Sequence, residues 1–505
     1  MSLWNSTCLL PTNASINVEG LYNEYYFDTG CSDTTTDQLL ESTFTFATTK
    51  NVLTTDQEIY LNVSFRTKYD GINERKQLNL VVVLDVSGSM SEHFSSPSTN
   101  GLESIKNQDL SSLTKIDVAK QVVKQLINNL KSNEQFGLVL FNSSANLLQP
   151  LRKVTGLNMN ELYEYVDQIR ADGGTNMECG MKMAVQMFSD MLSEYEIIGD
   201  EHHLNHILFL TDAQPNLGGG KESLIDSAVQ ASKLNIFVTY VGVGLDFNSE
   251  LVYQLTKTRG SNYYSVHSNE QFRKVLNDDF NYIINPIAFD IMVLIESEKY
   301  EIEKVYGIPK TGMTNEYFTF ASFSPSSLDN ESIRGCILVK LKEKIISNLN
   351  PSSMLKLTTK FDDIDDKRHQ STIEVDLNER LSRILSSTDD TDLVVLSTDD
   401  ENKYENTGIR KAILLAQYVS FITNVLTNIQ QETNTFYDDL GKPSKRTTSQ
   451  HSDDGNQAKL KISKIMKHDL IQFRKHFLRE IDAIGDKNLE HELDILDKFR
   501  YAEEI

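Results

Sequence analysis

Three short polar motifs in this chain share the residue types that bind a hard divalent cation. They are Asp85-Val86-Ser87-Gly88-Ser89, Gly173-Gly174-Thr175 and Thr211-Asp212. Hydroxyl and carboxylate oxygens are the ligands that Mg²⁺ and Mn²⁺ prefer in proteins. Each motif alone is weak, because serine-rich loops and aspartates at strand ends occur in many folds. Their meaning depends on whether the fold brings all three together.

The elements around the motifs predict that the fold does so. An unbroken apolar run at 80–84 ends directly before the first motif, and another at 207–210 ends before the third. Such runs are typical of strands buried on both faces of a parallel sheet. Strand and helix patterns alternate from residue 78 to about 285, which predicts an α/β fold with a doubly wound, mostly parallel sheet. Since the carboxyl ends of such strands share one edge, we expect the three motifs there.

At these motifs the chain resembles the von Willebrand factor A domain and its metal-ion-dependent adhesion site. The resemblance covers residues 78–285 and implies a Rossmann-like fold. It implies that Ser87, Ser89 and Thr175 give hydroxyl ligands to Mg²⁺, or to Mn²⁺ or Ca²⁺. It implies that Asp85 and Asp212 hold the metal largely through bound waters. One coordination position would stay open for an Asp or Glu carboxylate supplied by a protein partner.

The residue chemistry agrees with what the resemblance implies. Three neutral hydroxyls under-neutralise a divalent cation, so the metal remains attractive to an external carboxylate. The two glycines before Thr175 allow close approach of the backbone and a loop that can shift. The alternative is a site that keeps the motifs but binds no metal.

A polar insertion, residues 91–113, separates Ser89 from the first helix pattern and would lie beside the metal. Three interpretations stay open for this insertion. It is a specificity loop, a lid whose Glu92 occupies the open coordination position, or an ordinary solvated loop.

Strand patterns also flank the α/β unit. Within residues 41–77, apolar and polar side chains alternate from Ser42 to Arg66, which predicts half-buried strands. Residues 286–400 contain short strand patterns separated by turn residues. We expect both flanks to build one β-sandwich into which the α/β domain is inserted. The alternative is two unrelated patches of sheet. The whole arrangement resembles bacterial and protist proteins with this domain in a β-sandwich and, more loosely, inter-alpha-trypsin-inhibitor heavy chains.

The two ends of the chain carry different patterns. Residues 1–40 are polar and predict a loosely ordered arm. Residues 401–505 predict a helical region that contains a polar, mobile linker over 433–455. Its last two helices are expected either to pack against the sandwich or to bind a partner.

Composition limits the classes of partner. The 505 residues include 49 Lys and Arg against 72 Asp and Glu, a net charge of −23, which argues against nucleic acid and anionic membranes. We expect no membrane insertion, because no apolar stretch is long enough to span a bilayer. Four cysteines are too few for a disulfide framework, and the first residues do not resemble a signal peptide. These features favour an intracellular location.

The leading functional hypothesis is a non-enzymatic, adhesion-type protein that binds a partner carboxylate through a divalent metal. One alternative is a scaffold or regulatory subunit of an intracellular complex, for example one linked to an ATPase or to ubiquitin. The other is a metal-dependent hydrolase, which would rely on His202-His203-Leu204-Asn205-His206. That histidine group lacks a paired carboxylate base. Gly218-Gly219-Gly220 also lacks the Lys followed by Ser or Thr that a phosphate-binding loop needs.

Overall fold

The structure is a computed structural model of the whole chain. It describes residues 18–22, 25–28, 36, 38–67, 76–93, 113–195, 203–212, 220–243, 255, 257–266, 269–308, 313–324, 336–345, 351–386, 403–439, 461–462, 464–500 and 503–504. The sequence also predicts a short helix over 251–255, of which only Leu255 lies within these residues.

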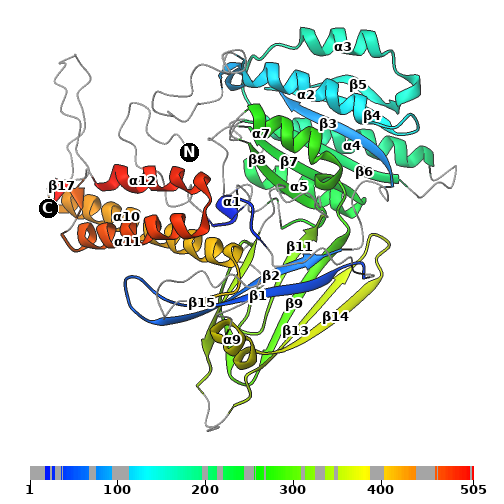
Figure 1. Cartoon of the computed structure of the whole chain (residues 1–505). Helices are drawn as coiled ribbons and strands as arrows, with labels where there is room; N and C mark the ends of the chain where they lie inside the picture. Colours follow the sequence, from blue (N-terminus) through cyan, green and yellow to red (C-terminus); the bar gives the residue numbers. More distant parts are fainter. Residues whose placement is uncertain are drawn as a thin grey trace, which may run out of the picture.

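A mixed sheet with helices on both faces forms the middle of the chain (Figure 1). Its six described strands follow the order β5-β4-β3-β6-β7-β8. They are β3 (Gln77–Asp85), β4 (Gln135–Phe141), β5 (Ala145–Lys153), β6 (His203–Thr211), β7 (Ile236–Val243) and β8 (Ser261–Val266). All neighbours pair in parallel except β4 and β5, which are antiparallel. The predicted doubly wound, mostly parallel sheet is therefore confirmed.

The unbroken apolar run of β3 is explained by two separate cores. Leu80, Val82 and Leu84 face one core, whereas Val81 and Val83 face the other. The first core is closed by α2 (Lys115–Asn129), α3 (Met159–Gln168), α7 (Asn269–Arg273), a π-helical turn (Lys274–Asp278) and α8 (Phe280–Ile283). The second is closed by α4 (Met177–Tyr195) and α5 (Gly220–Lys233). A strand covered on both faces needs apolar side chains at every position.

Strands from before and after this α/β domain build one β-sandwich. Its described sheets have the orders β10-β12-β2-β1-β15 and β11-β9-β13-β14. The strands are β1 (Glu41–Lys50), β2 (Gln57–Arg66), β9 (Ala288–Ser297), β10 (Tyr300–Tyr306), β11 (Tyr317–Phe323), β12 (Ile337–Glu343), β13 (Met354–Asp362), β14 (Arg368–Asp376) and β15 (Lys403–Tyr404). Val63 of β2 pairs with Ile337 of β12 across the inserted domain. The predicted insertion is therefore confirmed.

A helical module, defined here as α1 (Val18–Tyr22), α10 (Thr407–Asp439), α11 (Lys464–Ile484) and α12 (Glu490–Arg500), covers the outer face of the first sandwich sheet. Two-residue strands, β16 (Lys461–Ile462) and β17 (Glu503–Glu504), pair in parallel beside it. Tyr60 of β2 faces this module, whereas Leu61 and Val63 face the sandwich core. The centres of β1 and β2 are therefore buried on both faces rather than half-buried as predicted. The helices cover the face that the alternating pattern assigned to solvent.

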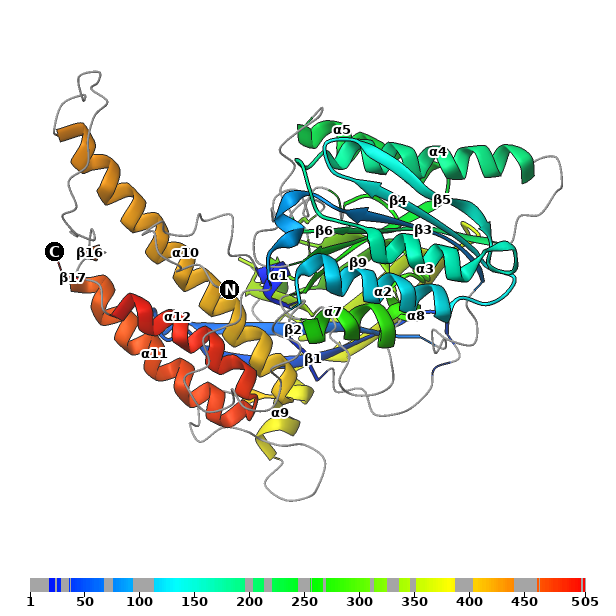
Figure 2. The same ribbon diagram turned by 90° about the horizontal axis from the view of Figure 1, so that it is seen from above.

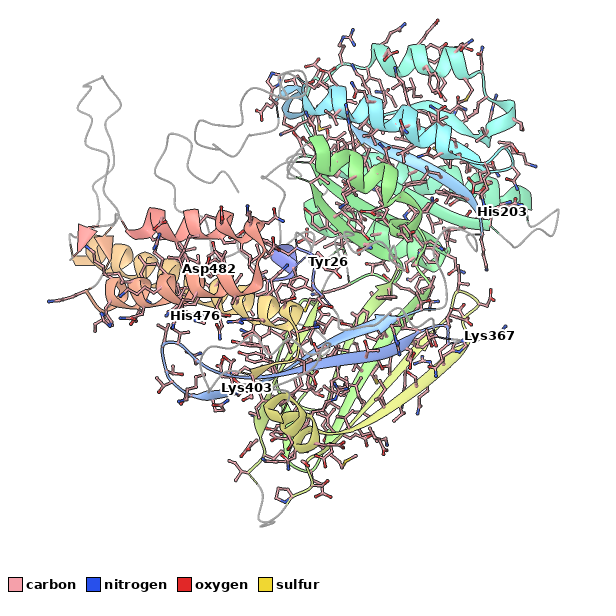
Figure 3. All side chains as sticks on the ribbon, viewed as in Figure 1. Tyr26, His203, Lys367, Lys403, His476 and Asp482 are labelled. Carbon is pink, nitrogen blue, oxygen red and sulfur yellow. The ribbon has the colours of Figure 1, made fainter. Side chains whose placement is uncertain are left out.

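The expected loose arm over residues 1–40 was wrong for residues 18–22 and 25–28. Tyr22 and Phe27 are buried in the helical module, and the Tyr22 hydroxyl donates to the Ala412 carbonyl at 2.6 Å. Lys411 donates to the carbonyl of Tyr26, which lies between the helices and the sandwich in Figure 3. Isolated aromatic residues within a polar stretch were sufficient to anchor the segment.

The linker predicted over 433–455 was also wrong at its start. Figure 2 shows α10 as one long helix, and it continues to Asp439. No Gly or Pro occurs from residue 433 until Gly441, so nothing in the sequence stops the helix earlier. Residues 440–455 lie outside the described part of the chain. A further helix, α9 (Leu377–Ser386), follows β14 within the region predicted to be strands.

Ion pairs join the α/β domain to the sandwich. Arg259 pairs with Asp290 at 3.0 Å and also with Asp366, and Lys76 pairs with Asp365 at 3.2 Å. Asp365 and Asp366 lie in the turn between β13 and β14, beside Lys367, which is labelled in Figure 3. The domain is thus fixed to the sandwich at the end of its sheet opposite the three motifs. Within the described residues, no helix is long and apolar enough to cross a membrane.

Candidate metal site

Asp85 ends β3 and is fully buried. Its Oδ1 accepts a hydrogen bond from the Ser87 backbone N–H at 2.8 Å, and its Oδ2 accepts one from the Thr211 hydroxyl at 2.5 Å. Burial raises the pKa of Asp85 to about 6, although the hydrogen bonds from Ser87 and Thr211 act in the opposite direction. A nearby cation would favour the charged carboxylate. The side chain is thus fixed in position and lacks a full counter-charge.

The two serine hydroxyls lie side by side on the turn that follows β3. A 3₁₀ turn, Gly88–Ser91, begins immediately after Ser87. The Oγ atoms of Ser87 and Ser89 are 3.2 Å apart. Adjacent ligands of octahedral Mg²⁺, at about 2.0–2.1 Å from the ion, are separated by about 2.9 Å. The two hydroxyls therefore fit neighbouring coordination positions of one magnesium-sized ion.

The Gly-Gly-Thr loop is bonded to this serine turn through the backbone. Gly88 N–H donates to the Gly173 carbonyl at 3.0 Å, and Asp172 N–H donates to the Val86 carbonyl at 2.8 Å. Gly173 has a φ of +81°, a left-handed conformation that favours glycine. Thr175 follows in the same loop and is 2 % exposed. The structure thus brings the second motif against the first.

Asp212 completes the group from the end of β6. Its Oδ1 accepts from the Ser89 hydroxyl at 2.7 Å, and its Oδ2 accepts from the Lys115 ammonium at 2.8 Å. Both charged side chains are buried. All three motifs therefore meet at one edge of the sheet. The described residues contain no cluster of three His, Cys, Asp or Glu side chains able to hold a metal. This edge of the sheet therefore presents hydroxyl oxygens rather than a cluster of carboxylates or imidazoles.

Lys115 was not identified from the sequence. It is the first residue of α2, directly after the N-cap Thr114. A cation at this position opposes the helix dipole, which favours acidic residues near the N-terminus of a helix. A lysine at this unfavourable position in the sequence was the one sign that its charge has a partner elsewhere. Sequence spacing could not reveal its partner, because Asp212 lies 97 positions away.

The ends of the polar insertion are held together beside the site. Lys115 N–H donates to the Glu92 carbonyl at 2.9 Å, and His93 Nδ1 lies 3.1 Å from the Leu113 carbonyl. The Glu92 carboxylate lies 3.7 Å from the Lys115 ammonium, and its side chain is 67 % exposed. Glu92 therefore faces Lys115 at the rim. The insertion between these ends, residues 94–112, lies outside the described residues.

The histidines considered for a hydrolase lie away from this edge. His203 begins β6, at the end of the strand opposite Asp212 (Figure 3). His206 is buried, and its Nε2 is 2.9 Å from the Thr239 hydroxyl. His202, Gly218 and Gly219 lie outside the described residues.

A model of the von Willebrand factor type A domain family matches residues 79–278. Inter-alpha-trypsin inhibitor heavy chain 4 of Mus musculus is 24% identical over 225 residues, which cover 44% of this chain and 21% of that protein. The Escherichia coli protein YfbK is 22% identical over 243 residues, which cover 48% of this chain and 37% of that protein. The matched part therefore spans about a fifth of the first relative and under two-fifths of the second.

Among solved structures, a von Willebrand factor type A protein from Catenulispora acidiphila has 13% sequence identity and a TM-score of 0.42. That similarity covers 68% of this chain and 75% of the other. The family model over residues 79–278 confirms the resemblance found in the motifs for that domain, and both heavy-chain and bacterial relatives match it.

Proposed function

Because residues 79–278 form a von Willebrand factor type A domain, we propose that this protein binds a protein partner through a divalent metal ion held at the edge of the domain. The metal would be held by Asp85, Ser87, Ser89, Thr175 and Asp212. Domains of this family are generally interaction modules rather than enzymes, and we propose a non-enzymatic role here. The partner would contribute an Asp or Glu carboxylate, and Mg²⁺ is the metal we favour.

The single observation that carries the proposal is the pair of hydroxyls at Ser87 and Ser89. Their 3.2 Å separation suits neighbouring ligands of a small octahedral ion. Thr175 would add a third hydroxyl, from a loop bonded to the serine turn. Asp85 and Asp212 would act largely through water, because hydrogen bonds already orient both of their oxygens.

Charge supports a carboxylate as the partner's ligand. Ligands that are mostly hydroxyls and water leave most of the metal's charge unneutralised, and the bound ion would supply the attraction for an incoming anion. The chain as a whole has a net charge of −23, which supports a protein partner rather than nucleic acid. Ser87, Ser89 and Thr175 would hold the ion through their hydroxyl oxygens and leave a coordination position for the partner's carboxylate.

A direct test measures Mn²⁺ binding by electron paramagnetic resonance for the wild type, Ser89→Ala and Ser91→Ala. Ser91 is the matched control, because it occupies the same turn and its hydroxyl only donates to the Gly88 carbonyl. We expect Ser89→Ala to weaken Mn²⁺ binding by about tenfold or more, a loss of about 1.4 kcal/mol. Ser91→Ala should bind as the wild type does. Equal binding by all three proteins would reject the site.

The partner is tested by capture from native extract. Wild-type protein is immobilised with Mg²⁺ or with EDTA, and Ser89→Ala and Ser91→Ala are immobilised with Mg²⁺. We expect one set of proteins to bind the wild type and Ser91→Ala only when Mg²⁺ is present. Replacing each Asp and Glu of a captured protein by Asn and Gln would then identify the carboxylate. Capture that is the same with EDTA and with Ser89→Ala would overturn metal-bridged binding.

A further inference from the structure

A buried ammonium group contacts the proposed metal site. Lys115 and Asp212 form an ion pair of 2.8 Å, in which the side chains are 7 % and 0 % exposed. The same ammonium also lies 3.7 Å from the carboxylate of Glu92, whose side chain is mostly exposed to solvent. Buried charges are retained only where they are paired, because an isolated ion in a protein interior is strongly unfavourable. Lys115 is therefore the structural counter-ion of Asp212.

The same ion pair changes the charge that a metal encounters. Asp85 and Asp212 contribute two negative charges and Lys115 contributes one positive charge, so these three buried side chains sum to −1. Glu92 is left out of this sum because its side chain is 67 % exposed and solvent screens its charge. With a divalent cation the sum becomes +1, whereas without Lys115 it would be zero. Like charges repel strongly at such distances in a partly buried site. Lys115 therefore disfavours the metal and favours an anionic ligand on the loaded site.

We propose that Lys115 is a built-in counter-cation that stabilises the metal-free site and competes with the metal ion for Asp212. This inference rests on the proposed function, because it requires a metal at the site. It assigns Lys115 a role in adjusting metal affinity rather than in ligation. The protein keeps an assembled binding edge without metal and binds metal less tightly than its oxygen ligands alone would allow.

The proposal predicts two effects of opposite sign for Lys115→Gln. The neutral amide removes the positive charge and leaves the charge of Asp212 unbalanced. The thermal midpoint in EDTA should therefore fall. Mn²⁺ should bind about tenfold more tightly to Lys115→Gln than to the wild type. Addition of Mn²⁺ should therefore raise the thermal midpoint more in the variant, because a ligand stabilises a protein according to its affinity for the folded state. A purely structural lysine would lower the midpoint without improving metal affinity.

Lys120→Gln is the matched control. Lys120 lies on the same helix, is also buried, and pairs with Asp117 at 3.6 Å rather than with the site. The Lys120→Gln variant loses one positive charge from α2, as Lys115→Gln does, but the lost charge is not paired with Asp212. Its Mn²⁺ affinity should therefore equal that of the wild type. An equal tenfold gain in Lys120→Gln would assign the effect to overall charge and overturn the proposal. Unchanged or weaker Mn²⁺ binding by Lys115→Gln would also overturn it.

Two further outcomes separate this inference from the proposed function. If the wild type binds no Mn²⁺, the proposed function itself fails. If Lys115→Gln is unfolded in EDTA, recovery of the fold on addition of Mn²⁺ supports the counter-cation role, and lack of recovery rejects it. Lys115→Arg keeps the positive charge and should not bind Mn²⁺ more tightly than the wild type. A tenfold gain in Lys115→Arg would show that charge is not the cause.

Discussion

At the scale of single residues, the proposed metal ligands are held in place by hydrogen bonds within the protein. Asp85 accepts from Ser87 and Thr211, and Asp212 accepts from Ser89 and Lys115. Such partners fix the orientation of ligands before a metal arrives. That the three motifs meet could be predicted from the sequence, because strand ends converge at one edge. Lys115 could not, since its role depends on a contact between distant parts of the chain.

The conformation of Gly173 gives the first prediction at this scale. Its φ is +81°, and an added Cβ would lie 3.2 Å from the Asn142 amide nitrogen and 3.3 Å from the Ser143 hydroxyl. Gly173→Ala should cost about 1–2 kcal/mol of stability, because a left-handed conformation is unfavourable for alanine. It should also weaken Mn²⁺ binding, since Gly173 bonds to the serine turn.

Thermal unfolding and Mn²⁺ titration check this prediction. The control is Gly156→Ala, because an added Cβ at Gly156 meets no atom within 4 Å. We expect the control to match the wild type in both measurements. Wild-type Mn²⁺ affinity in Gly173→Ala would mean that the position of this loop does not affect the site.

At the scale of elements, continuous apolar runs predicted β3 and β6 well, because only a strand covered on both faces has that pattern. The edge strand β5 was missed, since most of its side chains are partly or fully exposed and it contains Pro150. An edge strand needs neither an apolar run nor every backbone hydrogen bond. The burial of β1 and β2 was underestimated, because an alternating pattern indicates a strand with only one covered face. Their second face is covered by helices from distant parts of the chain.

Helix α11 gives a prediction of pH dependence. Burial lowers the pKa of His476, and the positive charges of Arg479 and Arg410 act in the same direction, whereas Glu480 opposes them. His476 and the nearby Asp482 are labelled in Figure 3. Below pH 6.5 the unfolded chain binds the proton more readily than the folded protein does. The free energy of unfolding should therefore fall as the pH falls from 6.5.

Replacing the histidine should remove this contribution. When the pH is lowered from 7.5 to 5.5, the free energy of unfolding should fall in both proteins. The fall should be up to about 1 kcal/mol smaller in His476→Gln than in the wild type. Chemical denaturation at the two pH values measures the difference. His468→Gln, on the exposed face of the same helix, is the control and should keep the wild-type dependence. A His476→Gln profile identical to that of the wild type would contradict the prediction.

At the scale of the whole molecule, the proposed metal site is separated from the contacts that join the domain to the sandwich. The inserted domain carries the site at one edge of its sheet, and Arg259 and Lys76 fasten it to the sandwich at the other. The insertion was predictable from strand patterns on both sides. Closure of the helical module by residues 18–28 was not, because Tyr22 contacts Ala412 across 390 positions and no local pattern reports such a contact.

Tyr22 gives a prediction at this scale. Its ring is fully buried and lies 5.1 Å from that of Phe27. Tyr22→Ala should destabilise the helical module by about 3–5 kcal/mol, as removal of a large buried aromatic side chain generally does. Mn²⁺ affinity should be unchanged, because the module does not contain the site. Hydrogen exchange of α10 and α11 measures the first effect.

The control is Tyr165→Ala, since this tyrosine is 44 % exposed on α3. It should change stability by less than about 0.5 kcal/mol. Exchange in α10 and α11 that is as slow in Tyr22→Ala as in the wild type would mean that residues 18–28 do not contribute to the module.

The contact between Tyr22 and Ala412 also constrains how the protein is made. A ribosome releases residues 18–22 and 25–28 before α11 and α12, which complete the surface that buries Tyr22 and Phe27. At about 5–20 residues per second, the early segment waits for on the order of tens of seconds. During that time its aromatic side chains are exposed, whereas the α/β domain contains all of its described strands within 77–266. The middle of the chain can therefore fold while Tyr22 and Phe27 still lack the surface that buries them.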